Sequence, residues 1–414
     1  MKKFGLLPRI VVAIVLGIVV GLWSPDWFVR IFETFNGIFS SFLTFIIPLI
    51  IVGLITPAIS ELGKGAGKWL GITAAIAYGS TLFAGFLALA VSMTVFPRML
   101  QPGSFTEVVN PAEALLGPYF TVEMPPVFGV MTALVISFVL GVGMTLLQTD
   151  TMHKGFVELR SIIEIVISAI IIPLLPLYIF GIFANMAAAG QVWDVVTTFA
   201  SVIVLVLSLT VVLLLIQYFV AGAIAKKNPL TSLRTMMPAY ATALGTSSSA
   251  ATIPVTLRQA VKMGVSRPVA SFVVPLCATI HLAGSTTKIV SFSLAVMFLA
   301  DVPVNIPVFI GFIFMLGITM VAAPGVPGGA IFAASGLLTS MLGFTEPQVG
   351  LMIATYIAID SFGTATNITG DGAIAMVVDT LSGDDLERDL LVEDEEGRLI
   401  AVPDEGEPYL QDKD

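Results

Sequence analysis

The sequence predicts an all-α integral membrane protein with about eight transmembrane helices and two re-entrant helical hairpins. Of its 414 residues, 57% are hydrophobic and only 11% are charged, whereas soluble domains carry roughly 25% charged residues. Six apolar stretches approach or exceed the ~20 residues that a helix needs to cross a bilayer. Two further apolar segments are interrupted by proline, glycine and serine, which predicts hairpins that enter and leave on one side of the membrane.

The net charge of −9 is concentrated at one end of the chain. Residues 384–414 hold 13 of the 28 acidic residues and three of the 19 basic ones. The rest of the chain is therefore almost neutral, and residues 382–414 are expected to form an acidic, solvated tail. No basic patch is present to neutralise phosphates, so we expect no nucleic-acid partner. The single cysteine, Cys277, excludes a disulfide framework and a cysteine metal cluster.

The six apolar stretches carry almost no charge and predict the first transmembrane helices. They cover residues 8–24, 36–59, 69–97, 126–148, 157–190 and 195–225. Several are longer than one perpendicular crossing requires, which predicts tilt or a break, as at Pro173, Pro176 and Gly181 in the fifth stretch. The first stretch is too long for a removed signal peptide and lacks a small-residue cleavage site.

The pattern changes after residue 228. Segments 229–260 and 305–345 are interrupted by Thr-Ser-Ser-Ser-Ala-Ala-Thr-Ile-Pro and by Ala-Pro-Gly-Val-Pro-Gly-Gly-Ala, and a helix follows each segment, near 266–299 and 347–379. Irregular backbone at membrane depth occurs only where protein buries it or where it lines a watery cavity. Interrupted segments in matched positions, as in inverted repeats, indicate a transporter binding site. The alternative is a pair of ordinary helices kinked by proline.

The basic residues predict the orientation of the chain. With a cytoplasmic N terminus, 16 of the 19 lysines and arginines fall on the cytoplasmic side, as the positive-inside rule requires. Only Arg30 and Arg98 fall on the other side, and Lys288 lies within a span. If segment 229–260 crossed the membrane, the three basic residues at 258–267 would lie outside, against the positive-inside rule, so a hairpin is the better interpretation. We therefore expect a multi-pass plasma-membrane protein, surrounded by lipid, with both termini in the cytoplasm.

The last predicted helix carries a polar stripe. Spacings of four, three and four residues place its members on one helical face: Asp360, Thr364, Asn367 and Asp371. Ionisable groups at membrane depth are costly and usually functional. Two carboxylates, an amide and a hydroxyl suit an alkali cation or a substrate ammonium, and neighbouring glycines allow backbone carbonyls to approach. The alternative is a stripe that only packs helices together.

A second polar group lies near the middle of the helix at 266–299. His281, Ser285 and Lys288 repeat the spacing of four and three. His281 is either a structural histidine or a proton carrier. Lys288 either pairs with Asp360 or Asp371, or binds a substrate carboxylate.

The two interruptions suggest complementary roles. The tip at 246–249 offers hydroxyls and backbone N–H groups that suit a carboxylate, and the glycine-rich tip at 325–329 is flexible enough to act as a gate.

The order of these motifs is a Ser-Ser-Ser hairpin, a broken helix with a polar centre, a Pro-Gly-rich hairpin and then Asn367-Ile-Thr-Gly-Asp371. This order resembles the dicarboxylate/amino acid:cation symporters, the glutamate transporter family, to about residue 381. The resemblance implies a homotrimer in which each protomer has a static scaffold and a transport domain that moves as an elevator. The scaffold would comprise residues 1–60 and 126–192. The transport domain would comprise 61–125 and 193–381, followed by the tail at 382–414.

The resemblance also implies roles for individual residues. Asn367 and Asp371 match sodium ligands, and Asp360 matches the acid that receives the substrate amino group. The full set of candidate cation-binding residues is Asn367, Asp371, Cys277 and His281, with His281 as a possible proton carrier. The candidate substrate-binding residues lie on both hairpin tips and both following helices: Ser248, Ser249, Ser285, Lys288, Val326, Gly328, Asp360, Gly363, Thr364 and Asn367.

Three positions depart from the family pattern. Gly363 stands where acidic-substrate members carry an arginine in the last helix, and Ser247 stands where some members carry one in the first hairpin. Ala283 replaces a sodium-binding acid. Together these departures indicate a neutral amino acid and fewer sodium ions. Lys288 is placed to replace the missing guanidinium, although a lysine makes a point-charge contact rather than a bidentate one.

We therefore predict a secondary active symporter, without a cofactor, that couples a small amino acid, preferably neutral, or a related dicarboxylate to Na⁺. The alternative is an H⁺- or Na⁺-coupled symporter of C4-dicarboxylates or acidic amino acids that uses Lys288. An enzyme is not expected, because Asp360 and Asp371 would lie about 16 Å apart along a helix, too far to share a proton. A third class is a passive channel. Unlike a symporter, a channel cannot accumulate its substrate against a gradient.

Overall fold

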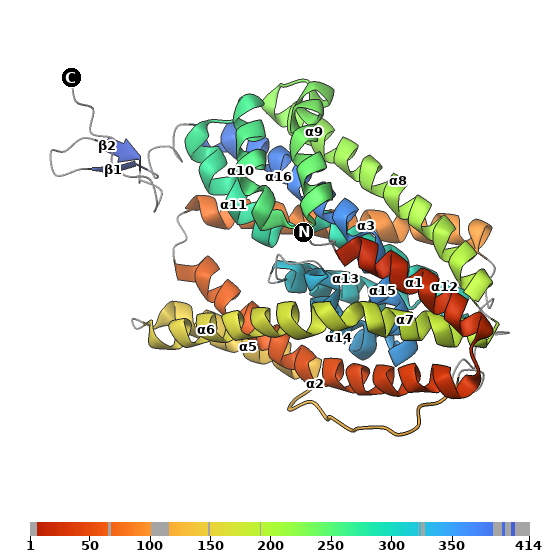
Figure 1. Cartoon of the computed structure of the whole chain (residues 1–414). Coiled ribbons are helices and arrows are strands. Elements are labelled where there is room, and N and C mark those ends of the chain that lie inside the picture. Colours follow the sequence, from red (N-terminus) through yellow and green to blue (C-terminus); the bar gives the residue numbers. More distant parts are fainter. Residues whose placement is uncertain are drawn as a thin grey trace, which may run out of the picture.

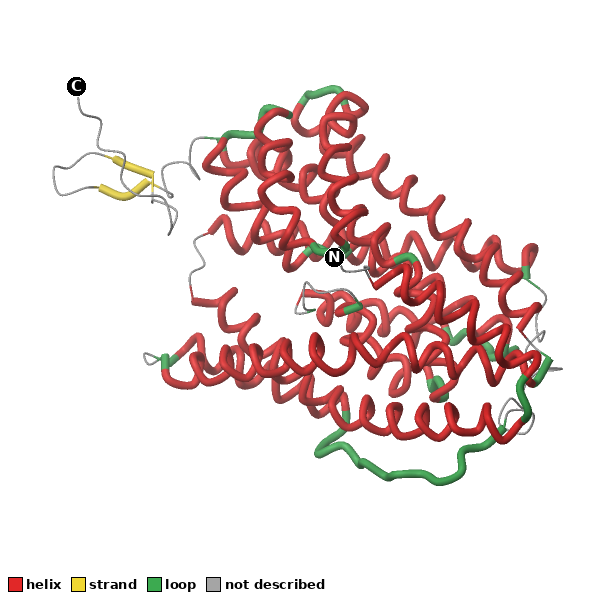
Figure 2. The backbone as a smooth tube through the Cα atoms, viewed as in Figure 1, coloured by secondary structure: helices red, strands yellow, loops and turns green. Residues whose placement is uncertain are grey.

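The computed structural model of the chain describes most of its residues. The described residues are 6–64, 68–100, 116–147, 150–190, 192–321, 323, 328–383, 391–393 and 399–401. The regular secondary structure of this part of the chain is helical apart from one short pair of strands, and loops join the elements (Figures 1 and 2). The predicted all-helical class is confirmed for the apolar body.

The helices of the first half are long and closely follow the apolar stretches. They are α1 (Leu6–Trp23), α2 (Asp26–Lys64), α3 (Lys68–Met99), α5 (Val130–Leu146), α6 (Thr151–Val166), the π-helix η1 (Ile167–Ile171), α7 (Ile172–Ala188) and α8 (Val192–Ala225). The second half contains shorter helices. They are α9 (Pro229–Thr246), α10 (Ser249–Lys262), α11 (Arg267–Ile280), α12 (Ala283–Leu299), α13 (Ile306–Val321), α14 (Gly329–Leu342), α15 (Glu346–Ala358) and α16 (Asp360–Ser382).

Within the described residues, five helical segments are long and apolar enough to cross a membrane, or six if the bent α15–α16 pair counts as one span. The five are Asp26–Pro57, Lys68–Met99, Thr151–Ala188, Ala200–Ala225 and Arg267–Leu299. The protein is therefore a multi-pass membrane protein, while the predicted total of about eight spans stays a prediction. Exposed apolar side chains are consistent with lipid contact, for example Val139, Ile165 and Val204, each more than 60% exposed.

The predicted break in the fifth apolar stretch lies earlier than expected. The helix widens to π geometry at Ile167–Ile171, directly before Pro173, and then continues through Pro176 and Gly181. Proline lacks an N–H and its ring crowds the carbonyl four residues earlier, so the irregular turn precedes it. Gly181 does not break the helix but lets the Asn36 side chain approach, since a Cβ there would lie 2.6 Å from its Nδ2.

The two interrupted segments fold as pairs of helices that pack against each other, α9 with α10 and α13 with α14. Ser247 joins the first pair in the left-handed backbone region, with φ of 50°. The helix after each pair is broken. The break within 266–299 agrees with the broken helix that the motif order predicts, and the break within 347–379 corrects the continuous helix expected there. The first break lies at His281–Leu282, and the second, a 62° bend, lies at Ile359.

Two buried apolar clusters hold the helices together. The larger joins α2 and α5–α7 to α12–α15, and the smaller joins parts of α3 and α8 to α9–α11 and α16. In Figure 1 the second group lies above the first. The site residues of α12 and α16 lie where the two groups meet, and most of their side chains are buried.

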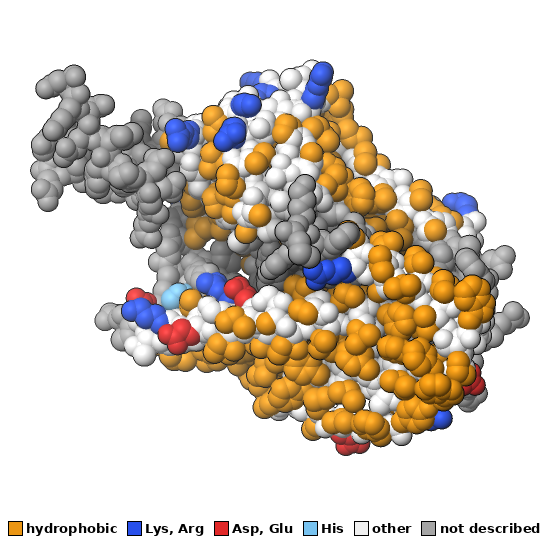
Figure 3. Space-filling view, in the orientation of Figure 1, with side chains coloured by type: hydrophobic (Ala, Val, Ile, Leu, Met, Phe, Trp, Pro, Cys, Tyr) orange, Lys and Arg blue, Asp and Glu red, His pale blue; other side chains and the backbone are white. Residues whose placement is uncertain are grey.

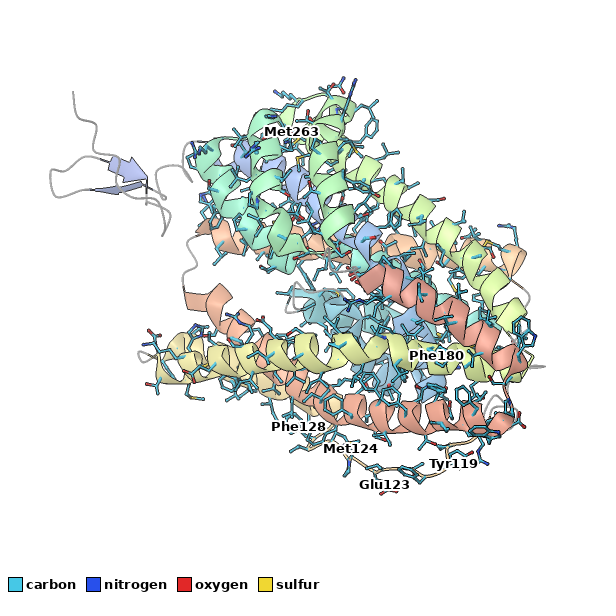
Figure 4. All side chains as sticks on the ribbon, in the orientation of Figure 1. Tyr119, Glu123, Met124, Phe128, Phe180 and Met263 are labelled. Carbon is cyan, nitrogen blue, oxygen red and sulfur yellow. The ribbon has the colours of Figure 1, made fainter. Side chains whose placement is uncertain are left out.

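A loop after the third helix was expected within 61–125, but its course along α2 and a pair of strands in the acidic tail were not predicted from the sequence. An irregular segment at 116–129 runs along α2, where Arg30 donates to the carbonyl of Gly117 at 3.0 Å and its guanidinium lies 4.5 Å from the Tyr119 ring centroid (Figure 4). In the acidic tail, β1 (Leu391–Glu393) pairs antiparallel with β2 (Leu399–Ala401), so this end of the chain is not wholly without regular structure.

Candidate substrate and cation site

A buried ion pair joins the two broken helices. Lys288 of α12 donates from Nζ to Oδ1 of Asp360, at the start of α16, over 3.0 Å. The Lys288 ammonium also lies 3.6 Å from the centroid of the Tyr356 ring on α15, a distance at which a cation is attracted to an aromatic face. Of the two carboxylate partners that the sequence allowed for Lys288, the structure selects Asp360.

Gly363 makes room for this lysine. A Cβ at position 363 would collide with Cε and Nζ of Lys288. The ammonium group therefore occupies the space into which any side chain at 363 would project. That Lys288 replaces the missing guanidinium at this position stays a prediction.

The second hairpin contacts the same carboxylate. The backbone N–H of Gly328, just before α14, donates to Oδ2 of Asp360 over 2.8 Å. Gly328 has φ of 76°, a left-handed conformation that suits glycine. Both oxygens of Asp360 are thus engaged, one by a cation and one by the hairpin. Val326, the other residue predicted at this tip, lies outside the described residues.

Asn367 organises the start of α12. Its Oδ1 accepts from the backbone N–H of Gly284 at 2.8 Å, and its Nδ2 donates to the Ser285 hydroxyl at 3.2 Å. The first N–H groups of a helix lack partners within it, so Asn367 acts as a cap supplied by a neighbouring helix. Ser285 also accepts from the Tyr356 hydroxyl at 2.9 Å, which leaves the Ser285 proton available to a substrate.

The first hairpin reaches the same place through its serines. The Ser248 side chain accepts from the N–H of Ala251 and caps α10, and Ser249 is buried. Both hairpins and both broken helices border one small cavity of about 20 Å³, room for about one water molecule. Its lining comprises Ser247, Ser249, Leu282, Ser285, Gly329, Ala330, Tyr356, Asp360, Thr364 and Asn367.

A second polar cluster surrounds Asp371. His281, at the break between α11 and α12, contacts Asp371 Oδ1 through Nδ1 at 2.9 Å and Ser80 Oγ through Nε2 at 3.1 Å. Gln217 of α8 donates to the Ser80 hydroxyl at 2.9 Å. The break at His281 means that it does not share a helical face with Ser285 and Lys288, contrary to the expectation from spacing.

The predicted cation-binding residues contact different partners and do not form one cluster in the described part of the chain. Asn367 faces the start of α12, whereas Asp371 faces His281, and Cys277 is buried one turn before His281. Among the described residues, no three histidines, cysteines or acids gather as a metal site. Sodium needs only oxygen ligands. Asp371 Oδ2 is buried and has no hydrogen-bond partner within the described part of the chain, so this oxygen suits an alkali cation.

Three residues of the site were missed by sequence reasoning. Tyr356 precedes Asp360 by four residues, the spacing that places two residues on one face of a helix, so this spacing could have linked Tyr356 to the polar stripe. Gln217 is an amide in an otherwise apolar stretch, which also marks it. Ser80 gave no signal, because small hydroxyl residues are common in transmembrane helices.

Ser80, His281 and Asp371 lie in the order of a hydrolase triad, but they do not make an active site. Ser80 sits in the middle of α3, where the backbone N–H groups are used by the helix. Many acyl-transfer sites use free backbone N–H groups to bind the developing oxyanion, and the helix around Ser80 offers no free backbone N–H group; the nearby donor is the Gln217 amide, which donates to the Ser80 hydroxyl itself. A cavity of about 320 Å³ borders Ser80 and Gln217, and its lining is otherwise almost entirely apolar.

The paired helices, the broken helices and the buried polar site between them define a secondary transporter. The profile of the Sodium:dicarboxylate symporter family matches residues 6–381. The chain belongs to this family and is a cation-coupled symporter of amino acids or dicarboxylates, not an enzyme.

Two curated relatives illustrate the range of the family. The chain is 26% identical over 401 residues to the serine/threonine transporter SstT of Acinetobacter baumannii (strain AYE), covering 92% of this chain and 98% of that protein. It is 33% identical over 191 residues to excitatory amino acid transporter 4 of Mus musculus, covering 45% of this chain. The latter match spans only 32% of the mouse protein.

Proposed function

We propose that the protein is a Na⁺-coupled symporter of small neutral amino acids in the plasma membrane. The observation that carries this proposal is the buried Lys288–Asp360 pair. The pair is electrically neutral, so a zwitterionic amino acid adds no net charge to the site. A second carboxylate on the substrate would lack a counter-ion of its own, which is costly in a buried site. The similarity to SstT, a serine/threonine transporter, supports the same substrate class.

The substrate's charged groups have complementary positions. Its ammonium would share Asp360 with Lys288. Its carboxylate would face Ser248 and Ser249 at the N terminus of α10, where hydroxyls and backbone N–H groups favour an anion. Ser285, Thr364 and Asn367 border the same cavity and offer hydrogen bonds to a small polar side chain.

Asp371 supplies the charge for the coupling ion. With a neutral His281, the pair carries one uncompensated negative charge, and one Na⁺ balances it through the free Oδ2 of Asp371. Ala283 offers no second acid, which agrees with a small number of ions. If a proton on His281 balances Asp371 instead, the coupling ion is H⁺, and the uptake experiment below separates the two.

The finer architecture is proposed on the same grounds. The order of helix pair followed by broken helix occurs twice, as expected for inverted repeats with two re-entrant hairpins. The division into a scaffold (1–60 and 126–192) and an elevator-type transport domain (61–125 and 193–381), the homotrimer and the cytoplasmic termini follow from family resemblance. Lysines and arginines gather over the ends of α9–α11 (Figure 3), which supports placing that end in the cytoplasm.

A second candidate substrate class is a C4-dicarboxylate or an acidic amino acid. The observation that favours it is the position of the Lys288 ammonium, which fills the space of a side chain at Gly363. If Lys288 leaves Asp360 when substrate binds, its ammonium can neutralise a second carboxylate.

Uptake into proteoliposomes tests these alternatives. Serine, threonine, alanine, aspartate, glutamate and succinate are each offered with an inward Na⁺ gradient, an inward proton gradient or neither. We expect Na⁺-driven, concentrative uptake of the neutral amino acids, and its loss in Asp360→Asn because the substrate ammonium loses its partner. Uptake of dicarboxylates alone, or uptake driven only by protons, would contradict the proposal. Uptake that never exceeds the outside concentration would indicate a channel.

A further inference from the structure

We infer that Lys288 is a tethered counter-ion that lets the transporter close and return across the membrane without substrate, so that it performs net uptake rather than obligatory exchange. The inference rests on the proposed function and deepens it, because it concerns the mode of transport at the same site. Two contacts carry it, Lys288 with Asp360 and Gly328 with Asp360. The third observation is that the Lys288 side chain occupies the space that a Cβ at Gly363 would need.

The chain's own groups satisfy the Asp360 carboxylate completely. Lys288 Nζ binds Oδ1 at 3.0 Å and Gly328 N–H binds Oδ2 at 2.8 Å. The Lys288 side chain is fully buried and Asp360 is 7% exposed. The second hairpin is therefore fastened to α16 through an acid whose charge is already balanced from within the protein.

The described residues leave little room beside Asp360. The cavity between the hairpins measures about 20 Å³, which is room for about one water molecule. Even a small amino acid needs several times that volume. The tip at Gly328 must therefore leave Asp360 before a substrate enters, and the contact with Asp360 re-forms when the substrate leaves.

The charge on Asp360 decides whether the closed site can cross the membrane. Carrying an unpaired charge through a low-dielectric region is costly, and leaving a buried carboxylate without its partner is strongly destabilising. With Lys288 in place, Asp360 is balanced whether or not substrate is bound. Without the ammonium, only a substrate amino group can balance it, so the carrier would cross only when loaded. Asp371 contacts His281, whereas Lys288 pairs with Asp360. The Asp371–His281 contact is the same in the variant and in the unmodified protein, so a change at Lys288 isolates Asp360.

The first test separates net uptake from exchange with L-serine as the probe. Labelled serine enters proteoliposomes that are either empty or preloaded with unlabelled serine. For Lys288→Met we expect net uptake to fall by at least about a hundredfold, because a buried charge loses its partner, while exchange stays within about threefold. Lys288→Arg keeps the cation and should retain more net uptake than Lys288→Met. Lys154→Met, on the exposed start of α6, is the control and should change neither.

Two further outcomes decide the inference. In Lys288→Ala, propylammonium in the buffer should restore net uptake at least in part, because a free cation can take the place of the tethered one. If net uptake and exchange fall together in Lys288→Met, Lys288 binds substrate or only holds the fold, and the inference is wrong. If neither changes, it is also wrong.

The second test needs no substrate. Ala330 of α14 is buried beside the cavity, so an Ala330→Cys variant reports closure through its reaction rate with a membrane-impermeant thiol reagent. The buried Cys277 is measured in the unmodified chain and subtracted. We expect Lys288→Met to raise the labelling rate by at least about tenfold, and Lys288→Arg to leave it low. Equal labelling rates in the Ala330→Cys protein with and without Lys288→Met would overturn the inference, whatever the substrate is. A finding that serine is not a substrate would count against the proposed function alone.

Discussion

At the scale of single residues, each buried basic side chain of the site lies against a glycine of α16. Lys288 fills the space above Gly363, and a Cβ at Gly370 would lie 2.7 Å from Cε1 of His281. The sequence suggested that these glycines let backbone carbonyls approach an ion. The structure shows a different use, because the missing side chains admit a lysine and a histidine into the face that carries Asp360 and Asp371.

Replacing Gly363 with alanine therefore tests the Lys288 position. The added Cβ displaces the ammonium from Asp360, and a broken buried ion pair costs about 3–5 kcal/mol. We expect Gly363→Ala to lower the melting temperature of the purified protein and to reduce serine uptake by at least about tenfold.

The matched control is Gly71→Ala in α3, where nothing lies within 4 Å of the added Cβ. This variant should behave like the unmodified protein. Adding Lys288→Ala to Gly363→Ala removes the Cε and Nζ atoms that the new Cβ meets, so the double variant should regain stability relative to Gly363→Ala alone. A Gly363→Ala protein with normal stability and uptake would show that the lysine adjusts without cost.

Sequence reasoning identified most polar residues of the site but few of their partners. The stripe on α16 follows from helical spacing alone, so Asp360, Thr364, Asn367 and Asp371 were found together. Lys288 had two carboxylates within plausible reach, and only the fold distinguishes them. Partners such as Ser80 and Gln217 come from helices far away in the sequence, and no local pattern connects them to His281.

At the scale of elements, helix breaks depend on acceptors that another helix supplies. The turn between α11 and α12 is possible because Asn367 Oδ1 takes the N–H of Gly284. Hydropathy cannot reveal such a cap, so the apolar pattern predicted an unbroken helix. The break at η1 is different, since it follows from the local chemistry of Pro173 and was predicted within a few residues.

Helix α1 shows how closely two elements approach through glycine. Gly17 and Gly21 are four residues apart and face the backbone of α7; a Cβ at Gly17 would lie 2.6 Å from the Phe180 carbonyl oxygen. A small residue at every fourth position is typical of tightly packed membrane helices. The crossing fastens α1 to α7, both of which belong to the proposed scaffold.

Gly21→Leu tests this crossing. The leucine has no space against Ala184 and Ala187, so α1 must separate from α7, and overpacking of this kind costs about 1–3 kcal/mol. We expect a lower melting temperature with unchanged affinity for serine in the protein that remains folded. Gly37→Leu in α2, with open space beside it, is the control. Equal melting temperatures for the two variants would contradict the crossing.

At the scale of the whole molecule, the coupling ion should stabilise the fold. A ligand that binds only the folded state adds about 2.7 kcal/mol at a concentration 100 times its Kd. Replacing Na⁺ with choline should therefore lower the melting temperature, and Asp371→Asn should abolish this difference because the charged oxygen is lost. Asp26→Asn, at the exposed start of α2, should keep the full Na⁺ effect. A Na⁺ effect that survives in Asp371→Asn would place the ion elsewhere.

The contact between Lys288 and Gly363 also limits how related sequences can diverge. A long side chain at 363 cannot coexist with a lysine at 288, because both need the same space. A lineage that gains an arginine at 363 must lose the lysine first or at the same step, and an intermediate with neither leaves Asp360 unbalanced. Among homologues, the two positions should therefore vary together, and a change of substrate class should pass through paired substitutions rather than single ones.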